Sequence, residues 1–416
     1  MAIERLILSA MPGERRLAAI ENGRLAELVQ VRADIESRIG EVRLGRVTKV
    51  AGGLDAAFVD VGLSRSGFLA LAEARPPGTS GGTIADHVRE GDTVAVQVIR
   101  DPIGDKGVKL TTRIDADLPI DVAGARPPKL LHAPPDAILA YLIGLPSDTA
   151  PPIAVDDGIA AVELTAALKP IRPDLAARIE RVPADVFVTE GIEDEIETAL
   201  SPRVPLAGGG ALTIEETEAL VAVDVDGGDA HAGGQTQTAL AVNLRAAEEL
   251  ARQVRLRRLG GLIAVDFLPL RKRPHRDKLL DRLRQAFAGD VAGVEIAGFT
   301  RLGLMEMIRR RQGPSLLETM TRPALSGIGR EPHPAARAFA ALRAARREAK
   351  AKPGRALALL AHRTILHALE GPAAEALGVV EAQLGRPLER DIDPALAPGD
   401  FSIVAGSGDT GRGDGR

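Results

Sequence analysis

Cysteine is absent from the 416 residues of this sequence. Disulfides, thiol catalysis and zinc sites with thiolate ligands all need cysteine, so the sequence excludes them, and we expect no zinc. Aromatic residues are also few, with eight Phe, one Tyr and no Trp. A surface that stacks bases on aromatic rings would therefore depend on a small number of Phe side chains.

Long apolar runs and an excess of charge of one sign are missing as well. No apolar run reaches about 18 residues, the length that predicts a membrane span, and "MAIERLILSA" at the N-terminus lacks the layout of a signal peptide. We therefore expect a cytoplasmic protein with no membrane partner. The formal net charge is only -4, so a nucleic-acid surface must come from local clusters of Arg and Lys.

Residues 36–113 have the pattern of a small antiparallel barrel. Short alternating strands follow one another with glycine turns at intervals of about ten residues. Phe58 and Phe68 fall in this region, with Arg65 between them and Lys106 nearby. Barrels of the OB type bind single-stranded nucleic acid on such aromatic residues beside a basic groove. The alternative is that both Phe side chains belong to the barrel core.

Residues 211–320 contain three acidic residues at the ends of two apolar strands. "EALVAVDVDGG" ends in Asp224 and Asp226, which are two positions apart and therefore face the same side of a strand. An amphipathic helix follows and stops at a Gly pair, and the next strand, "LIAVDF", ends in Asp266. Acids at the carboxyl ends of neighbouring strands lie where open α/β sheets bind their ligands.

Carboxylates that converge without His or Cys suit Mg²⁺, with Mn²⁺ as an alternative. Such an ion can hold a phosphodiester oxygen and activate a water molecule. Basic residues that could neutralise RNA phosphates surround this region, namely Arg255, Arg257, Arg258, Arg271, Arg273 and the run Arg309, Arg310 and Arg311. The alternative is that Asp266 only pairs with an Arg or caps a helix.

The chain resembles the bacterial ribonuclease E/G family, whose members are endoribonucleases that cut single-stranded RNA. The similarity covers about residues 1–113 and 190–320. Five stretches carry it: "DAAFVDVGLSRSGFLAL", "GDKGVKLTT", "EALVAVDVDGG", "NLRAAEELARQVRLRRLGGLIAVDF" and "RLGLMEMIRRRQGPSL".

The resemblance implies a multidomain fold of the α+β and α/β classes. An OB-fold barrel would be inserted in a ribonuclease H-like domain and followed by a deoxyribonuclease I-like α/β catalytic domain and a small C-terminal α/β module. The implied boundaries are 1–35 with 114–205 for the reduced ribonuclease H-like domain, 36–113 for the RNA-binding barrel, 206–320 for the catalytic domain, 321–355 for a linker and basic helix, 356–405 for the C-terminal module and 406–416 for a disordered tail.

The resemblance also assigns roles to individual residues. Asp224 and Asp266 fall on the family's magnesium-binding aspartates, and Asp226 stands where the family has an Asn beside the metal pair. The implied reaction is Mg²⁺-dependent hydrolysis of single-stranded RNA that leaves a 5′-phosphate and a 3′-hydroxyl. The implied RNA-contacting residues are Phe58, Phe68 and Lys106 in the barrel and Arg309 in the catalytic domain.

Two departures from the family pattern are predicted. "TTRIDADLPIDVAGARPPKLLH" leads almost directly from the barrel to the ribonuclease H-like region, so the family's 5′-monophosphate sensor is missing. The zinc link between protomers cannot form without cysteine, which leaves a homodimer open but not a zinc-linked one. These losses and Asp226 keep an alternative function open, that of an RNA-binding protein with weak or lost nuclease activity.

Overall fold

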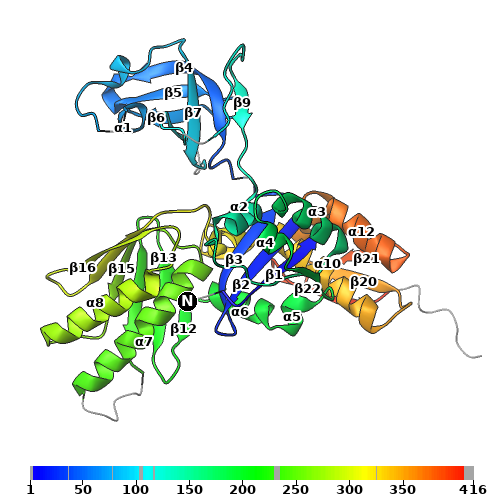
Figure 1. Cartoon of the computed structure of the whole chain (residues 1–416). Helices are drawn as coiled ribbons and strands as arrows, with labels where there is room; N and C mark the ends of the chain where they lie inside the picture. Colours follow the sequence, from blue (N-terminus) through cyan, green and yellow to red (C-terminus); the bar gives the residue numbers. More distant parts are fainter. Residues whose placement is uncertain are drawn as a thin grey trace, which may run out of the picture. The chain divides into compact units, whose positions relative to one another are not determined.

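Two units make up the chain in the computed structural model, one formed by residues 1–35 with 137–416 and the other by residues 36–136 (Figure 1). No helix in the described part is long and apolar enough to cross a membrane. The predicted tail lies outside the described residues apart from Gly406. The structure describes residues 3–406 except for positions 36, 77, 103–105, 116–117, 229–234 and 325, and only the backbone of 235–238.

The N-terminal sheet is buried on both faces. Strands β1, β2 and β3 form an antiparallel meander, and β10 and β11 extend it parallel to β1, in the order β11-β10-β1-β2-β3. Leu6 and Leu8 of β1 pack with α2 and α3, whereas Ile7 packs with α5 and α6. The bounds are β1 Arg5–Met11, β2 Glu14–Glu21, β3 Arg24–Arg32, β10 Ile153–Val155, β11 Ile179–Arg181, α2 Ala137–Gly144, α3 Gly158–Leu168, α4 Pro173–Ala176, α5 Val186–Thr189 and α6 Ile192–Leu200.

The second unit is a closed five-stranded barrel, consistent with the predicted OB fold. Its strands pair in the ring β4-β5-β6-β8-β7, and β7 returns to β4. At Gly67 a Cβ would lie 2.4 Å from the Leu110 side chain, so glycine allows β6 and β8 to approach closely. The bounds are β4 Val42–Ala51, η1 Gly52–Leu54, β5 Ala56–Asp60, β6 Gly67–Ala70, α1 Leu71–Ala74, η2 Ile84–Asp86, β7 Thr93–Arg100, β8 Lys109–Thr111 and β9 Lys129–His132.

The barrel unit is longer than the predicted 36–113. After β8 the chain returns to the barrel, where β9 pairs with β4, and the unit therefore ends at residue 136. The sequence of β9, "KLLH", is too short to have a recognisable strand period.

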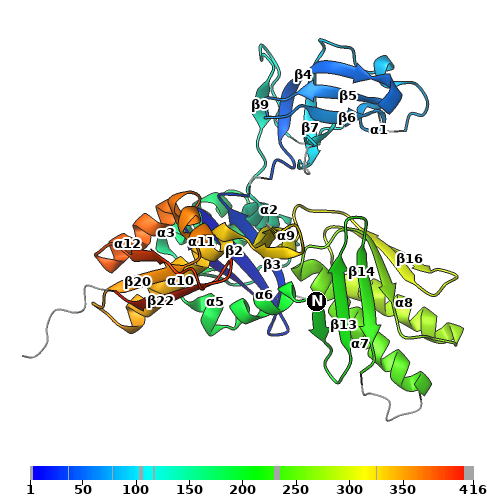
Figure 2. The same ribbon diagram turned by 180° about the vertical axis from the view of Figure 1, so that it is seen from behind.

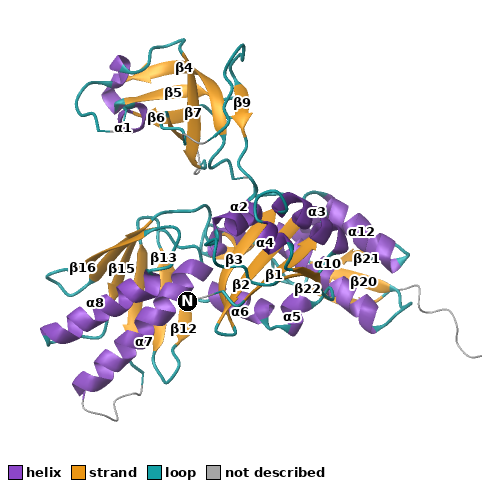
Figure 3. Ribbon diagram, viewed as in Figure 1, coloured by secondary structure: helices purple, strands orange, loops and turns teal. Residues whose placement is uncertain are grey.

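A six-stranded sheet follows in the first unit, in the order β12-β13-β14-β15-β17-β16. Strands β14 and β15 are parallel neighbours joined through α7, which is the β-α-β unit expected from the sequence. Helices α7 and α8 cover one face of the sheet (Figures 1 and 3), and Figure 2 shows its strands from the opposite face. The bounds are β12 Arg203–Pro205, β13 Ala211–Glu216, β14 Val221–Asp226, α7 Gln235–Leu256, β15 Gly261–Asp266, α8 Arg273–Phe287, β16 Val294–Phe299 and β17 Met305–Arg309.

The C-terminal part is built around the basic helix α10. Its Phe339 and Leu342 are fully buried against β20, α11 and α12, so this helix belongs to the C-terminal domain rather than to a linker at 321–355. The Ala-rich face lets the helix pack closely. Its arginines are half-buried, and Arg337 donates to the carbonyl of Gly399 at 2.6 Å and lies over the ring of Phe401. The bounds are α9 Leu316–Met320, β18 Thr321–Pro323, β19 Arg330–Pro332, α10 Pro334–Ala351, β20 Leu357–Ala361, α11 Arg363–Glu370, α12 Ala374–Leu384, β21 Glu389–Ile392 and β22 Phe401–Ala405.

A buried ion cluster connects the N-terminal sheet, α6 and α10. Arg16 of β2 donates two hydrogen bonds to Glu193 of α6, at 2.7 and 3.0 Å, and Arg343 of α10 donates to Glu14. Burial alone would raise the pKa of Glu193, but the charges of Arg16 and Arg343 and the hydrogen bonds from Arg16 lower it to about 2.

Candidate active site

Asp224 and Asp266 are direct partners in the register of two parallel strands. Residues at alternate positions, such as Val223 and Val265, point into the core beneath α7 and α8. The two aspartates therefore emerge together on the opposite face, where both are exposed. Neighbouring strands are about 4.8 Å apart, so the two carboxylates lie side by side.

Neither carboxylate of this pair has a hydrogen-bond or ion-pair partner among the described residues. Two neighbouring negative charges without a counter-charge repel each other, which favours a divalent cation between them. The described part of the chain contains no group of three or more His, Asp or Glu side chains that could hold a metal. Mg²⁺ fits such a pair because it commonly takes one or two carboxylates and completes its shell with water and substrate phosphate.

Asp226 lies on the same face, two positions further along β14. Its Oδ2 accepts a hydrogen bond from Arg203 at 3.1 Å, and its Oδ1 accepts one from the backbone N–H of Gly228 at 2.9 Å. The charge of Asp226 is thus partly neutralised by protein groups, unlike the charges of Asp224 and Asp266. Residues 229–234, in the turn that follows, lie outside the described residues.

A basic loop follows β15 and begins next to Asp266. Arg271 and Lys272 are exposed in the loop, and Arg273, the exposed first residue of α8, lies 3.9 Å from Asp277 in an ion pair. The loop is fixed by Arg276, whose Nε donates to the carbonyl of Leu270 at 2.8 Å and whose guanidinium lies 5.8 Å from the ring centre of Phe299. The exposed cations of this loop are therefore held close to the end of the strand that carries Asp266.

The barrel has a row of aromatic and basic side chains across four strands. In register, Lys49 of β4 pairs with Phe58 of β5, Phe58 with Phe68 of β6, and Phe68 with Lys109 of β8. The two rings meet edge to face, with centres 5.9 Å apart. Both Phe side chains are partly exposed and lie outside the buried barrel core, which argues against the interpretation that they are core residues.

Lys106 is exposed and lies close to the start of β6. The next residue, Gly107, passes so near this strand that a Cβ would lie 2.1 Å from the carbonyl oxygen of Ser66. Lys106 thus precedes a residue that lies directly against the segment leading to Phe68.

Comparison with known proteins agrees with these features. The sequence model of the Ribonuclease E/G family matches residues 109–312, which include Asp224, Asp266 and the six-stranded sheet. Ribonuclease G of Salmonella typhimurium (strain SL1344) is 27% identical over 486 aligned positions, which cover 96% of this chain and 99% of the relative. The chain belongs to the ribonuclease E/G family.

Two further comparisons cover less of the proteins involved. Ribonuclease E of Escherichia coli (strain K12) is 30% identical over 414 positions, which cover 79% of this chain and 39% of that relative. The solution structure of GSP13 from Bacillus subtilis overlaps 23% of this chain and 68% of its own, with 25% identity and a TM-score of 0.18, too low for any structural conclusion.

The position of Arg309 in this member of the ribonuclease E/G family does not fit the predicted contact with RNA. The side chain is 4% exposed, and its Nε and Nη2 donate to Asp290 at 2.7 and 3.0 Å. Its Nη1 donates to the carbonyl of Leu259 at 2.7 Å. Strand alternation explains the burial, because Arg309 follows the core residues Met305 and Met307 at even spacing. This geometry favours a structural ion pair.

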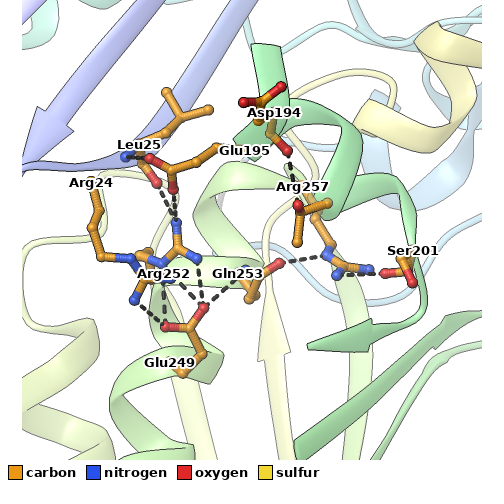
Figure 4. A network of polar contacts seen from close by, with 10 residues as sticks. Arg24, Leu25, Asp194, Glu195, Ser201, Glu249, Arg252, Gln253 and Arg257 are labelled. Atoms are coloured by element: carbon orange, nitrogen blue, oxygen red, sulfur yellow. Dashed lines mark hydrogen bonds and ion pairs between the residues drawn. The ribbon is translucent and has the colours of Figure 1, made fainter. Parts of the chain in front are cut away.

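Arg255 and Arg257 were also predicted to face RNA. Both instead form hydrogen bonds within the protein. Arg255 forms a buried ion pair with Glu21. Arg257 donates to Gln253 at 2.7 Å and to the carbonyl of Ser201 at 2.9 Å (Figure 4). Burial lowers the pKa of Arg257 to about 10. Their helical spacing from buried Leu and Val residues in "ARQVRLRRL" was the signal that could have indicated burial.

The same close-up shows how α7 is attached to the N-terminal part of the chain (Figure 4). Arg252 donates to Glu249 on its own helix, to Glu195 on α6 and to the carbonyl of Leu25. Burial alone would raise the pKa of Glu249, but the hydrogen bond and charge of Arg252 lower it below its usual value. These contacts fix the helix that connects the two aspartate-bearing strands.

Proposed function

We propose that this protein is a Mg²⁺-dependent endoribonuclease that hydrolyses single-stranded RNA and leaves a 5′-phosphate and a 3′-hydroxyl, in cytoplasmic RNA processing or decay. The observation that carries the proposal is the register pair of Asp224 and Asp266, two exposed carboxylates that have no ion-pair partner within the described part of the chain. Membership of the ribonuclease E/G family supports the endonuclease activity.

In the proposed mechanism, Asp224 and Asp266 would hold one Mg²⁺. When bound, this ion supplies charge stabilisation at the scissile phosphate and lowers the pKa of a water molecule. Arg271, Lys272 and Arg273 bind the phosphates on either side of the scissile bond and so fix the RNA backbone at the sheet edge. Asp226 adds a hydrogen-bond acceptor on the same face, and Arg203 limits the repulsion that this third carboxylate exerts on the substrate.

The proposed RNA-binding surface of the barrel is the row of Lys49, Phe58, Phe68 and Lys109 together with Lys106. Bases stack on exposed aromatic rings with little sequence preference, and the lysines follow the backbone phosphates. The two partly exposed rings lie between two cations in register, an arrangement that supports this role.

We further propose that the N-terminal sheet is ribonuclease H-like, that the six-stranded sheet is deoxyribonuclease I-like, and that the family's 5′-monophosphate sensor is missing. In support of the last point, β9 is the only helix or strand between β8 and α2 among the described residues there. The alignment with the Salmonella relative is also longer than this chain, so that relative contains segments without a counterpart here.

The test is cleavage of a labelled, AU-rich single-stranded RNA by the purified chain with Mg²⁺ or with EDTA. We expect cleavage with Mg²⁺ only, and loss of cleavage with retained RNA binding in Asp266→Asn. The matched control is Asp391→Asn, which changes an exposed aspartate on β21 that has no hydrogen-bond or ion-pair partner in the described ranges and should stay fully active. If the unchanged protein binds the RNA and leaves it intact, the alternative of an RNA-binding protein without nuclease activity is correct.

A further inference from the structure

A cavity of about 400 Å³ lies in the first unit, at the end of the six-stranded sheet that is remote from the aspartate pair. Gly261, the first residue of β15, pairs with Arg309 in the cavity wall, whereas Asp266 is the last residue of that strand. Five residues of extended strand separate the two places, a distance of roughly 16 Å. The volume lies in the range of small-molecule sites, about 300–1,000 Å³.

Two ion pairs in the cavity wall are complete. Arg255 donates to both carboxylate oxygens of Glu21, at 2.8 and 2.9 Å, and Arg309 does the same to Asp290. Because each of these arginines is matched by its own carboxylate, the two pairs leave little net charge for a ligand.

Three hydrogen-bond donors in the same wall are not matched. The hydroxyl of Tyr141 and the Nε of Arg255 are buried without a hydrogen-bond partner in the described part of the chain. Arg258 donates one hydrogen bond to the carbonyl of Gln312, at 2.5 Å, and has no carboxylate partner among the described residues. Burial, and next the charge of Arg309, lower the pKa of Arg258, while the charge of nearby Glu27 acts in the opposite direction.

The backbone of Arg258 is unusual as well. Its φ of 54° is left-handed, at the end of α7 where glycine normally stands. The chain keeps an arginine at a position that disfavours every residue with a side chain, and this arginine lines the cavity. The arginine thus occupies this position at a local conformational cost.

The rest of the cavity wall is mostly apolar and suits an uncharged ring of a ligand rather than another charged group. Apolar side chains from three parts of the chain line it, namely Ile3, Val29, Ala137, Ala140, Leu145 and Ala286. Glu27 also faces the cavity, where it lies beside the hydroxyl of Tyr141 and accepts one long hydrogen bond, from Arg255 at 3.4 Å. Burial raises the pKa of Glu27, and its carboxyl group can exchange hydrogen bonds with hydroxyl or amino groups of a ligand.

We propose that this cavity binds a small phosphate monoester of mononucleotide size. The phosphate accepts hydrogen bonds from Arg258, Tyr141 and the Nε of Arg255, three donors for its three terminal oxygens. The ring lies against the apolar wall, and Glu27 accepts from the sugar hydroxyls. This site lacks the aspartate pair, so the proposal does not depend on the nuclease function.

The test is calorimetric titration of the full chain with AMP, adenosine and inorganic phosphate, all in EDTA so that no metal contributes. We expect saturable binding of AMP, with adenosine and inorganic phosphate each at least about tenfold weaker. Equal binding of adenosine and AMP would overturn the phosphate assignment, and absence of saturable AMP binding would overturn the proposal.

Variants then locate the site. Arg258→Gly removes the guanidinium and also relieves the left-handed backbone, so AMP binding should fall at least about tenfold while the thermal stability stays equal or rises. Tyr141→Phe removes only the unpartnered hydroxyl and should weaken AMP several-fold without loss of stability. The control is Arg386→Ala, an exposed arginine of the C-terminal domain that donates to the carbonyl of Gly354. Unchanged AMP affinity in Arg258→Gly would refute this site.

Discussion

Replacing one aspartate of the pair should change stability in opposite directions with and without Mg²⁺. Without metal, Asp224 and Asp266 repel each other across about 5 Å, which for exposed charges amounts to about 1 kcal/mol. Asp266→Asn removes this repulsion and breaks no hydrogen bond or ion pair among the described residues. The variant should therefore be slightly more stable than the unchanged protein in EDTA, by up to about 1 kcal/mol in the unit that carries the sheet.

With Mg²⁺ the unchanged protein should instead be the more stable of the two. At a concentration ten times the dissociation constant, Mg²⁺ stabilises the unchanged protein by about 1.4 kcal/mol, whereas Asp266→Asn lacks half of the ligand pair and should respond much less. Thermal unfolding followed by scanning calorimetry over a series of Mg²⁺ concentrations measures both effects, with Asp391→Asn as the control. If Asp266→Asn gained as much stability from Mg²⁺ as the unchanged protein, the metal would bind elsewhere and the reasoning would be refuted.

The other predictions concern the barrel, the buried ion pairs and the missing sensor. Phe58→Ala and Phe68→Ala should each weaken binding of a fluorescent single-stranded RNA by about 1–3 kcal/mol in anisotropy titrations; unchanged affinity would contradict the stacking surface. Asp290→Ala leaves Arg309 buried without its partner and should destabilise the first unit by about 3–5 kcal/mol in urea unfolding, whereas a change within experimental error would disprove the structural ion pair. The pKa of Glu193 is depressed from 4.5 to about 2, so its stabilisation is present above pH 4.5 and is lost as the pH falls toward 2; Glu193→Gln should flatten that acid limb of stability, and an unaltered limb would contradict the assignment. A 5′-monophosphate on the RNA should not accelerate cleavage over a 5′-hydroxyl, and a several-fold acceleration would show that a sensor is present.

The elements that could be predicted from the sequence are those in which the alternation of apolar and polar residues along a strand also fixes the face on which the functional residues lie. The alternation in "VAVDVD" and "LIAVD" places Asp224 and Asp266 on the face opposite the core, and the helix between the strands favours a parallel pair. That the two strands are direct neighbours, with the aspartates in register, is seen in the structure. For Phe58 and Phe68 the sequence left an RNA-stacking role and burial in the barrel core both open, and their register with Lys49 and Lys109 could be seen only in three dimensions.

The errors have a common physical cause, which is burial of charge. Arg309, Arg255 and Arg257 were interpreted as phosphate ligands because composition does not reveal whether an arginine is bound within the protein, by a carboxylate for Arg309 and Arg255 and by Gln253 and the carbonyl of Ser201 for Arg257. Glu21 lies more than two hundred residues before Arg255, and no local pattern connects them. The helix α10 was similarly assigned to a linker because its many arginines obscured the buried Phe339 and Leu342.

The insertion of the barrel between β3 and β10 has a consequence for synthesis of the chain. Strand β1 is the centre of the N-terminal sheet, but its parallel partner β10 lies beyond the whole barrel, as the pairing of Leu8 with Val155 shows. A ribosome that adds about 5–20 residues per second makes the intervening stretch in on the order of ten to thirty seconds. During this time one edge of β1 has no partner strand and is open to wrong pairing. The barrel pairs only with strands of its own unit, so it can fold in that interval, before the N-terminal sheet is complete.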